Sequence, residues 1–167
     1  QGMDLPLTDP LAGQGAGTIR IRQASLGPGP LVEQLVGLTR AIRSLGDGRA
    51  PAEGNARWVE LPAQDINFRI AAGRVHHDRL EARIGDVVIV TRGSVGSDQS
   101  IDLVAVVPIN QNWVNTKPLL KPLAGLEVQV PIRGTLSRPQ IDRDVLTQLS
   151  RRVVEQAAGQ LLDEQIQ

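Results

Sequence analysis

Two adjacent histidines, His76 and His77, are the side chains of this sequence that metal ions bind most readily. Neighbouring side chains of a strand point to opposite faces of the sheet, so these two imidazoles cannot hold one ion together. His76 and Asp78 have the i, i+2 spacing that places two ligands on one face, but one such pair is a weak signal. We interpret both histidines as polar surface residues and expect neither a bound metal ion nor a cofactor.

Serines and carboxylates could supply a nucleophile or an acid–base pair, but their surroundings do not favour catalysis. None of the serines lies in a Gly-x-Ser-x-Gly elbow, and the segment GSVG at residues 93–96 lacks the strand-to-helix turn that exposes such a nucleophile. Asp86, Asp98 and Asp102 fall at expected turns and strand starts, where Asp commonly hydrogen-bonds the backbone. We therefore predict that the protein has no catalytic residue and is not an enzyme.

A glycine-rich stretch, GQGAG at residues 13–17, resembles part of the fingerprint that binds dinucleotides. That fingerprint works because the glycines lead into a helix whose N-terminus faces the pyrophosphate. Here the glycines lead into an alternating pattern typical of a strand, so we do not interpret them as a nucleotide site.

The composition argues against nucleic acid as a partner. The chain of 167 residues has 18 Lys and Arg and 18 Asp and Glu, and its formal net charge is zero. Binding to phosphates needs a clustered basic surface, and stacking of bases needs aromatic side chains, of which the chain has one Phe, two Trp and no Tyr. The absence of cysteine excludes disulfides and thiolate metal sites.

The main organising feature is a two-residue period of apolar side chains along residues 64–107. This period places the apolar residues on one face of a pleated sheet, and turn residues recur at the spacing of an antiparallel meander. Further strands are predicted at residues 18–22 and 126–133, and Pro131 marks the latter as an edge strand or a strand with a bulge. Residues 110–122 are predicted to be a polar loop that holds Trp113. This side chain either anchors the loop on the core, which is the commoner case, or lies at a membrane interface.

Two helices are predicted beside the sheet. The first covers about residues 30–45 and carries an apolar stripe of Leu31, Leu35, Leu38, Ile42 and Leu45. The second covers about residues 142–162, with Asp142 as its N-cap and a stripe of Leu146, Leu149, Val153, Ala157 and Leu161. The fold class is therefore α+β and mainly β: a curved antiparallel meander with one apolar face, covered or closed at its end by two flanking helices.

The chain is expected to form one domain over residues 13–167, preceded by an extended arm at residues 1–12. The opening Gln1-Gly2-Met3 is typical of what a cleaved purification tag leaves before a first Met. Apolar runs such as residues 103–109 are far shorter than the roughly 20 residues of a membrane-spanning helix.

Four stretches, in this order, resemble the C-terminal region of the AsmA-like family of Gram-negative envelope proteins. They are Gly15-x-Gly17-Thr-Ile-Arg-Ile before the leucine-striped helix, Phe68-Arg-Ile70-x-x-Gly73-Arg-Val75, Gly93-Ser-Val95-x-x-Asp98-x-x-Ile101-Asp-Leu103, and Val130-Pro-Ile-Arg-Gly134-Thr-Leu-Ser-Arg-Pro139-Gln-Ile-Asp142. The last is the most specific, and the resemblance spans most of residues 13–162.

The resemblance implies a periplasmic or cell-envelope location and a role in lipid transport and membrane biogenesis. AsmA-like proteins are similar to bridge-type lipid transporters, which have long curved sheets with an apolar trough and an anchor in the inner membrane. It implies phospholipid or a fatty acyl chain as a partner, with membrane attachment through parts of the parent protein outside this sequence. It supplies no catalytic residues, and the protein partners stay open.

The residues that would line such an apolar trough are those of the inner face of the predicted strands. We predict acyl-chain contacts for Ile66, Phe68, Ile70, Leu80, Ile84, Ile101, Leu103, Val128 and Val130. The alternative is that these residues form a closed core under the two helices, in which case the domain is an interaction or scaffold module without a ligand. Val104 and Val106 favour the first hypothesis slightly, because they make the other face of their strand partly apolar as well.

Overall fold

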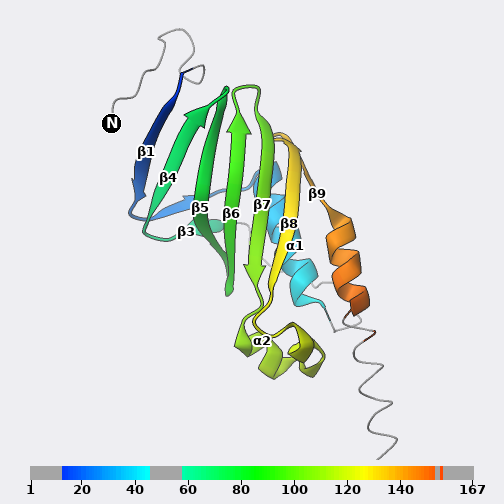
Figure 1. Cartoon of the computed structure of the whole chain (residues 1–167). Coiled ribbons are helices and arrows are strands. Elements are labelled where there is room, and N and C mark those ends of the chain that lie inside the picture. Colours follow the sequence, from blue (N-terminus) through cyan, green and yellow to red (C-terminus); the bar gives the residue numbers. More distant parts are fainter. Residues whose placement is uncertain (1–12, 46–57, 153–154, 156–167) are drawn as a thin grey trace, which may run out of the picture.

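The computed structural model describes residues 13–45, 58–152 and 155 (Figure 1). The predictions for the arm at residues 1–12 and for Val153, Ala157 and Leu161 lie outside these residues. The elements are β1 (Gly15–Ile21), β2 (Ala24–Leu26), α1 (Pro30–Arg43), β3 (Val59–Leu61), β4 (Gln64–Ala71), β5 (Arg74–Ile84), β6 (Val87–Gly96), β7 (Ser100–Pro108), α2 (Gln111–Thr116), the 3-10 helix η1 (Pro118–Leu123), β8 (Glu127–Thr135) and β9 (Arg138–Ile141). A further helix covers residues 143–152.

All strands belong to one open, curved antiparallel sheet of nine strands with the main order β1-β4-β5-β6-β7-β8-β9 (Figure 1). Strands β4 to β9 form a meander, in which each strand pairs with the next along the chain. Its strands β4 to β7 correspond to the meander predicted over residues 64–107. β1 pairs with β4, although β2, α1 and β3 lie between them in the sequence. β3 pairs with both β2 and β5. The predicted fold class, mainly β with flanking helices, is confirmed.

The ladder register shows which side chains share a face of the sheet, because directly paired residues point to the same side. Leu103 pairs with Gly93 on one neighbour and with Ile132 on the other, and Ala105 pairs with Thr91 and Val130. The face that contains these residues, here called the inner face, carries most of the apolar residues of the meander.

A bulge in β5 changes the alternation along that strand. The register with β6 shifts between His77 and Leu80, so Asp78 and Arg79 together lie opposite Arg92. As a result, odd-numbered residues point to the inner face before the bulge and even-numbered residues after it. Val75 and His77 therefore share the inner face with Leu80, although sequence alternation alone separates them.

Helix α1 covers part of the inner face. Pro30 occupies its first turn, as predicted, and its buried residues are Val32, Leu35, Val36, Leu38, Thr39 and Ile42. Leu38 and Ile42 are 1% and 0% exposed and belong to the same cluster as Val130 and Ile132 of the sheet. Burial of this helical face against the sheet is the main source of its stability, because a 14-residue helix is marginal on its own.

The helix of residues 143–152 begins where the sequence predicts. The Asp142 carboxylate accepts a hydrogen bond from the backbone N–H of Asp144 at 3.0 Å, which is the contact that defines an N-cap. Val145, Leu146 and Leu149 are half-buried against the core. This helix lies on the same side of the sheet as α1, beyond β8 (Figure 1).

The prediction of a polar loop over residues 110–122 is wrong. This segment forms α2 and η1, and Asn110 caps α2 by accepting a hydrogen bond from the Trp113 N–H at 2.9 Å. Trp113 is buried at 8% exposure and its indole N–H donates to Asp86 Oδ2 at 3.4 Å. The predicted anchoring role of Trp113 is therefore confirmed, while the short helices were obscured by polar residues and prolines.

Strand β9 was not predicted, and β8 is consequently not an outermost strand along its whole length. β9 pairs with residues 132–135 of β8. Pro131 is compatible with its place in β8. Its carbonyl oxygen accepts a hydrogen bond from the Asp142 N–H at 3.0 Å, so the backbone of Pro131 faces the β9 side, at the end of the β9 ladder. The N–H that proline lacks would point to that side, where none of the described strands would pair with it. Beyond this point, toward Glu127, β8 has no further strand beside it among the described residues.

Candidate functional site

The register places all nine predicted lipid-contacting residues on the inner face, but α1 divides them into two groups. The first group belongs to the closed core cluster together with α1, and consists of Ile84, Ile101, Leu103, Val128 and Val130. These side chains are at most 5% exposed, so they cannot contact a ligand unless the helix moves. For this group the structure corresponds to the closed-core arrangement.

The second group lies at one corner of the inner face, outside or at the margin of the core cluster. Ile66 and Ile70 are 6% and 7% exposed but are not part of the core cluster, Phe68 is half-buried, and Leu80 is half-buried at the edge of that cluster. This corner is formed by β1, β4, the first half of β5 and the second half of β6.

Three residues that the sequence analysis did not select complete this corner. Val75 pairs with Ile70 and with Val95, and both valines are half-buried. Ile19 pairs with Ile66 and is 53% exposed. We call the inner-face corner the apolar hollow, and its apolar side chains are Ile19, Ile66, Phe68, Ile70, Val75, Leu80 and Val95.

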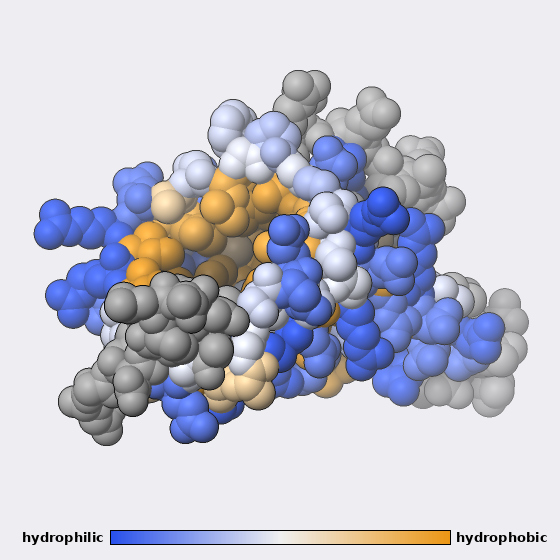
Figure 2. All heavy atoms as spheres, turned by 90° about the horizontal axis from the view of Figure 1, so that it is seen from above, coloured by the Kyte–Doolittle hydropathy of each residue, from blue (hydrophilic) through white to orange (hydrophobic). Residues whose placement is uncertain are grey.

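Figure 2 looks onto the end of the sheet where β4 and β6 end and β5 begins. Apolar side chains gather there around a depression that is bordered by polar side chains. Apolar surface is common on proteins, but a contiguous concave patch with a polar rim is typical of a binding surface.

Two glycines of the inner face are packed closely by their neighbours. The ring of Phe68 lies over Gly17, since a Cβ atom at that position would be 2.8 Å from the ring. Gly93 has a φ of +135° and lies so close to β7 that a Cβ atom would be 2.2 Å from the Asp102 carbonyl oxygen. A side chain at Gly17 would displace the Phe68 ring, and one at Gly93 would displace the backbone of β7.

One polar pair lies on the floor of the hollow. His77 Nε2 and Thr91 Oγ1 are 3.1 Å apart, and Thr91 is 7% exposed. Apart from Gln64, whose amide bonds the backbone of Pro62 and Glu81, they are the polar side chains on the inner face of β4–β8. Burial among apolar groups lowers the pKa of His77, while contacts with Thr91 and the charge of Asp78 act in the opposite direction. His77 is therefore held in its neutral form at neutral pH.

The outer face of the sheet is polar around the same corner. His76 lies there between Arg69 and Ser94, so the two histidines do face opposite sides. The Arg74 guanidinium donates to Ser94 Oγ at 2.8 Å and to Ser100 Oγ at 2.7 Å. These bonds connect β5, β6 and β7 and give Arg74 a structural role.

The carboxylates that the sequence analysis assigned to turns and strand starts make local bonds. Asp98 Oδ1 accepts from the Ser100 N–H and hydroxyl at 3.0 and 2.6 Å, and these bonds lower its pKa. Asp86 lies 3.2 Å from Arg43 in an exposed ion pair, and Asp102 lies 3.6 Å from Arg133. No group of three or more potential metal ligands occurs among the described residues.

Val104 and Val106 lie on the outer face, as predicted, beside Val90. Val106 is 7% exposed although it lies outside the core cluster that contains α1. Within the part of the chain that the structure describes, no helix covers this face, since α1 and the helix of residues 143–152 pack on the inner face.

No protein-family model matches this chain, and no curated protein or solved structure is significantly similar to it. Within the described residues, no helix combines the length and the apolar character needed to cross a membrane.

Proposed function

We propose that this chain is a non-enzymatic module of the cell envelope that contacts the acyl chains of phospholipids through the apolar hollow. The proposal takes its location and substrate class from the resemblance of the sequence to AsmA-like proteins. The observation that carries it is that the apolar inner face extends beyond the area covered by α1, and that its uncovered corner is concave and partly exposed.

The chemistry of the hollow suits hydrocarbon. Ile19, Phe68 and Val95 offer apolar surface on three strands, and each CH₂ group that leaves water on such a surface contributes about 0.8 kcal/mol. The polar outer face and rim would keep a charged headgroup in water. A shallow hollow of this kind holds part of a chain reversibly, which is what transfer between membranes requires.

A matched pair of substitutions tests the proposal. Val95→Glu places a charge in the hollow, and Val90→Glu places the same charge at a half-buried position of the same strand on the outer face. We expect phospholipid to co-purify with the wild-type protein and with Val90→Glu. The amount of bound phospholipid should fall at least about fivefold in Val95→Glu, since the free energy of burying an unpaired charge exceeds the free energy that a fivefold change represents. Native mass spectrometry and lipid extraction measure the lipid content of each purified protein, and circular dichroism verifies that each variant is folded.

Equal lipid content in the two folded variants, or none in the wild-type protein, would contradict the proposal.

The alternative function, an interaction or scaffold module without a ligand, is favoured by one observation. Ile84, Ile101, Leu103, Val128 and Val130 are buried under α1 and form an ordinary core. A wild-type protein that carries no co-purified lipid, and whose thermal stability does not respond to added fatty acid, would support this alternative.

A further inference from the structure

A second surface, distant from the apolar hollow along the strands, combines a free strand edge with a cavity that both apolar and polar side chains line. It lies at the beginning of β8, where β9 no longer covers the edge. Among the described residues the sheet has an open edge there, because β9 pairs only with residues 132–135 of β8. An open edge presents backbone groups that can bond another strand.

The backbone groups on this edge can be identified from the hydrogen bonds on either side. Pro131 accepts from Asp142 on the β9 side, and Leu126 accepts from Ile109 on the β7 side, at 3.0 and 2.9 Å. In an antiparallel ladder successive residues bond to opposite neighbours. The N–H and C=O groups of Glu127 and Gln129 therefore face the open edge, and no hydrogen bond from a described residue reaches them.

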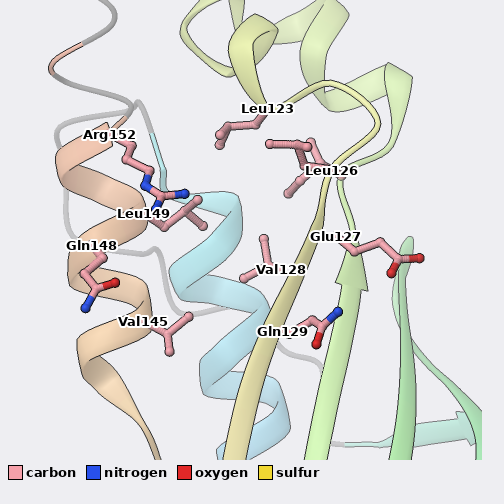
Figure 3. Close-up of a pocket in the computed structure, with 10 residues that line it drawn as sticks. Leu123, Leu126, Glu127, Val128, Gln129, Val145, Gln148, Leu149 and Arg152 are labelled. Carbon is pink, nitrogen blue, oxygen red and sulfur yellow. The ribbon is translucent and has the colours of Figure 1, made fainter.

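A groove runs along this edge, between β8 and the helix of residues 143–152, with α1 behind it (Figure 3). It holds a cavity of about 360 Å³, within the range of peptide and small-ligand sites. The side chains of Leu123, Val128, Val145 and Leu149 point into it from both walls (Figure 3). Leu126 at its rim is 51% exposed and adds apolar surface beside the groove.

The charges at the groove are asymmetric. The Arg152 guanidinium points into the groove from the helix and makes no ion pair with a described residue, whereas the Glu127 carboxylate points away from it (Figure 3). The groove therefore presents one positive charge at the end that lies next to η1. A carboxylate on an occupant would complement it.

We propose that this groove binds an extended peptide of a partner protein, which adds to the free edge of β8 as a further strand in line with β9. The backbone groups of Glu127 and Gln129 bond the peptide main chain, as in other cases of strand addition. Because alternate side chains of a strand point to one side, the peptide carries an apolar residue at every second position toward Val128 and Leu149. A carboxylate near one end of the segment pairs with Arg152.

An acyl chain has no groups that could hydrogen-bond the free backbone edge, whereas a peptide main chain has them. The edge therefore favours a polypeptide over an acyl chain. The site is separate from the apolar hollow, and neither proposal depends on the other. Vesicles of phosphatidylglycerol added as competitor distinguish the two occupants, because they leave peptide binding unchanged if the groove takes a polypeptide alone.

The test uses the full chain and a phage-displayed library of random linear dodecapeptides, followed by synthetic copies of the enriched sequences. Gln129→Pro removes one of the two N–H groups that face the edge, at a place where proline is compatible with an edge strand. Gln129→Ala is the matched control, since it removes the same side chain and keeps the N–H. Val145→Glu charges the groove wall, and Thr147→Glu places the same charge on the exposed side of that helix.

We expect enriched peptides with apolar residues at alternate positions and an acidic residue. Their affinity, measured by fluorescence anisotropy, should fall about tenfold in Gln129→Pro and in Val145→Glu, and stay within about twofold in both controls. Hydrogen exchange should show that the amides of Glu127 and Gln129 become protected only when the peptide is bound.

Three results would overturn the proposal. The first is a library without enrichment over a parallel selection on Val145→Glu. The second is a set of peptides that bind Gln129→Pro as tightly as Gln129→Ala. The third is protection of the Glu127 and Gln129 amides in the free protein, which would show that the chain itself or a second copy occupies the edge.

Discussion

His77 combines an ionisable ring with a position on the floor of an apolar surface. Its pKa is lowered mainly by burial, so the folded protein favours the neutral ring more strongly than the unfolded chain does. Between the folded and the unfolded pKa the unfolded chain binds more protons. The contribution of His77 to stability is therefore present above the ordinary value of 6.5 and is lost as the pH falls below it toward the folded pKa.

A comparison of His77→Gln with His76→Gln measures this effect. Wild type and His76→Gln should lose free energy of unfolding as the pH falls from about 7.5 to 5, because protonation of His77 charges the apolar floor. His77→Gln should lose distinctly less over the same range. Urea denaturation at several pH values gives the slopes, and indistinguishable slopes for wild type and His77→Gln would refute the assignment.

The same residue shows where sequence reasoning at this scale stops. The alternation of Leu80, Ala82 and Ile84 was recognised, and extrapolated backward it places His76 on the inner face in place of His77. The bulge at Asp78 and Arg79 reverses this order, and no composition signal marks it. For that reason Val75 and His77 were absent from the predicted site, while Phe68 and Ile70 on the regular strand β4 were included.

At the scale of elements, α1 decides which part of the inner face is core and which part is open. Its stripe is wider than the predicted one, since Val32, Val36 and Thr39 are buried beside Leu35, Leu38 and Ile42. A pattern of period 3.6 predicts the helix and its apolar side, but it does not specify how far along the sheet the helix lies. The division of the nine predicted contacts into core and hollow could not follow from sequence.

Neighbouring substitutions in α1 separate packing from helix propensity. Leu38→Ala should lower the free energy of unfolding by about 2–5 kcal/mol, because a fully buried Leu leaves a cavity against the sheet. Gly37→Ala should raise it by up to about 1 kcal/mol, because Gly37 is exposed, has open space around it and lies in the helix interior. Denaturant titrations measure both values. A loss below about 1 kcal/mol for Leu38→Ala would mean that α1 does not pack on the sheet as described.

The other helices and strands were predicted correctly where apolar residues recur at regular spacing. They were missed where prolines and polar residues dominate the sequence. The meander of β4 to β7, the strand β8 and both flanking helices followed from alternation or from a helical stripe. The elements β2, β9, α2 and η1 did not, since β2 and β9 are 3 and 4 residues long and α2 and η1 are 6 residues each, too short to establish a period.

At the scale of the whole molecule, two surfaces of one sheet have different character. The hollow at one end presents side chains and no free backbone in its floor, which suits hydrocarbon. The groove at the start of β8 presents free backbone groups beside a cavity with a mixed apolar and polar lining, which suits a polypeptide. A module with both surfaces could contact lipid while it is held by a protein partner.

The most direct measurement of the lipid proposal is photolabelling of the wild-type protein with a phospholipid that carries a diazirine in its acyl chain. Tandem mass spectrometry then locates the label. We expect label on hollow residues such as Phe68, Val75 and Val95, and none on the outer-face residues Val90 and Val104. Label spread equally over both faces, or no label above that of a heat-denatured control, would contradict it.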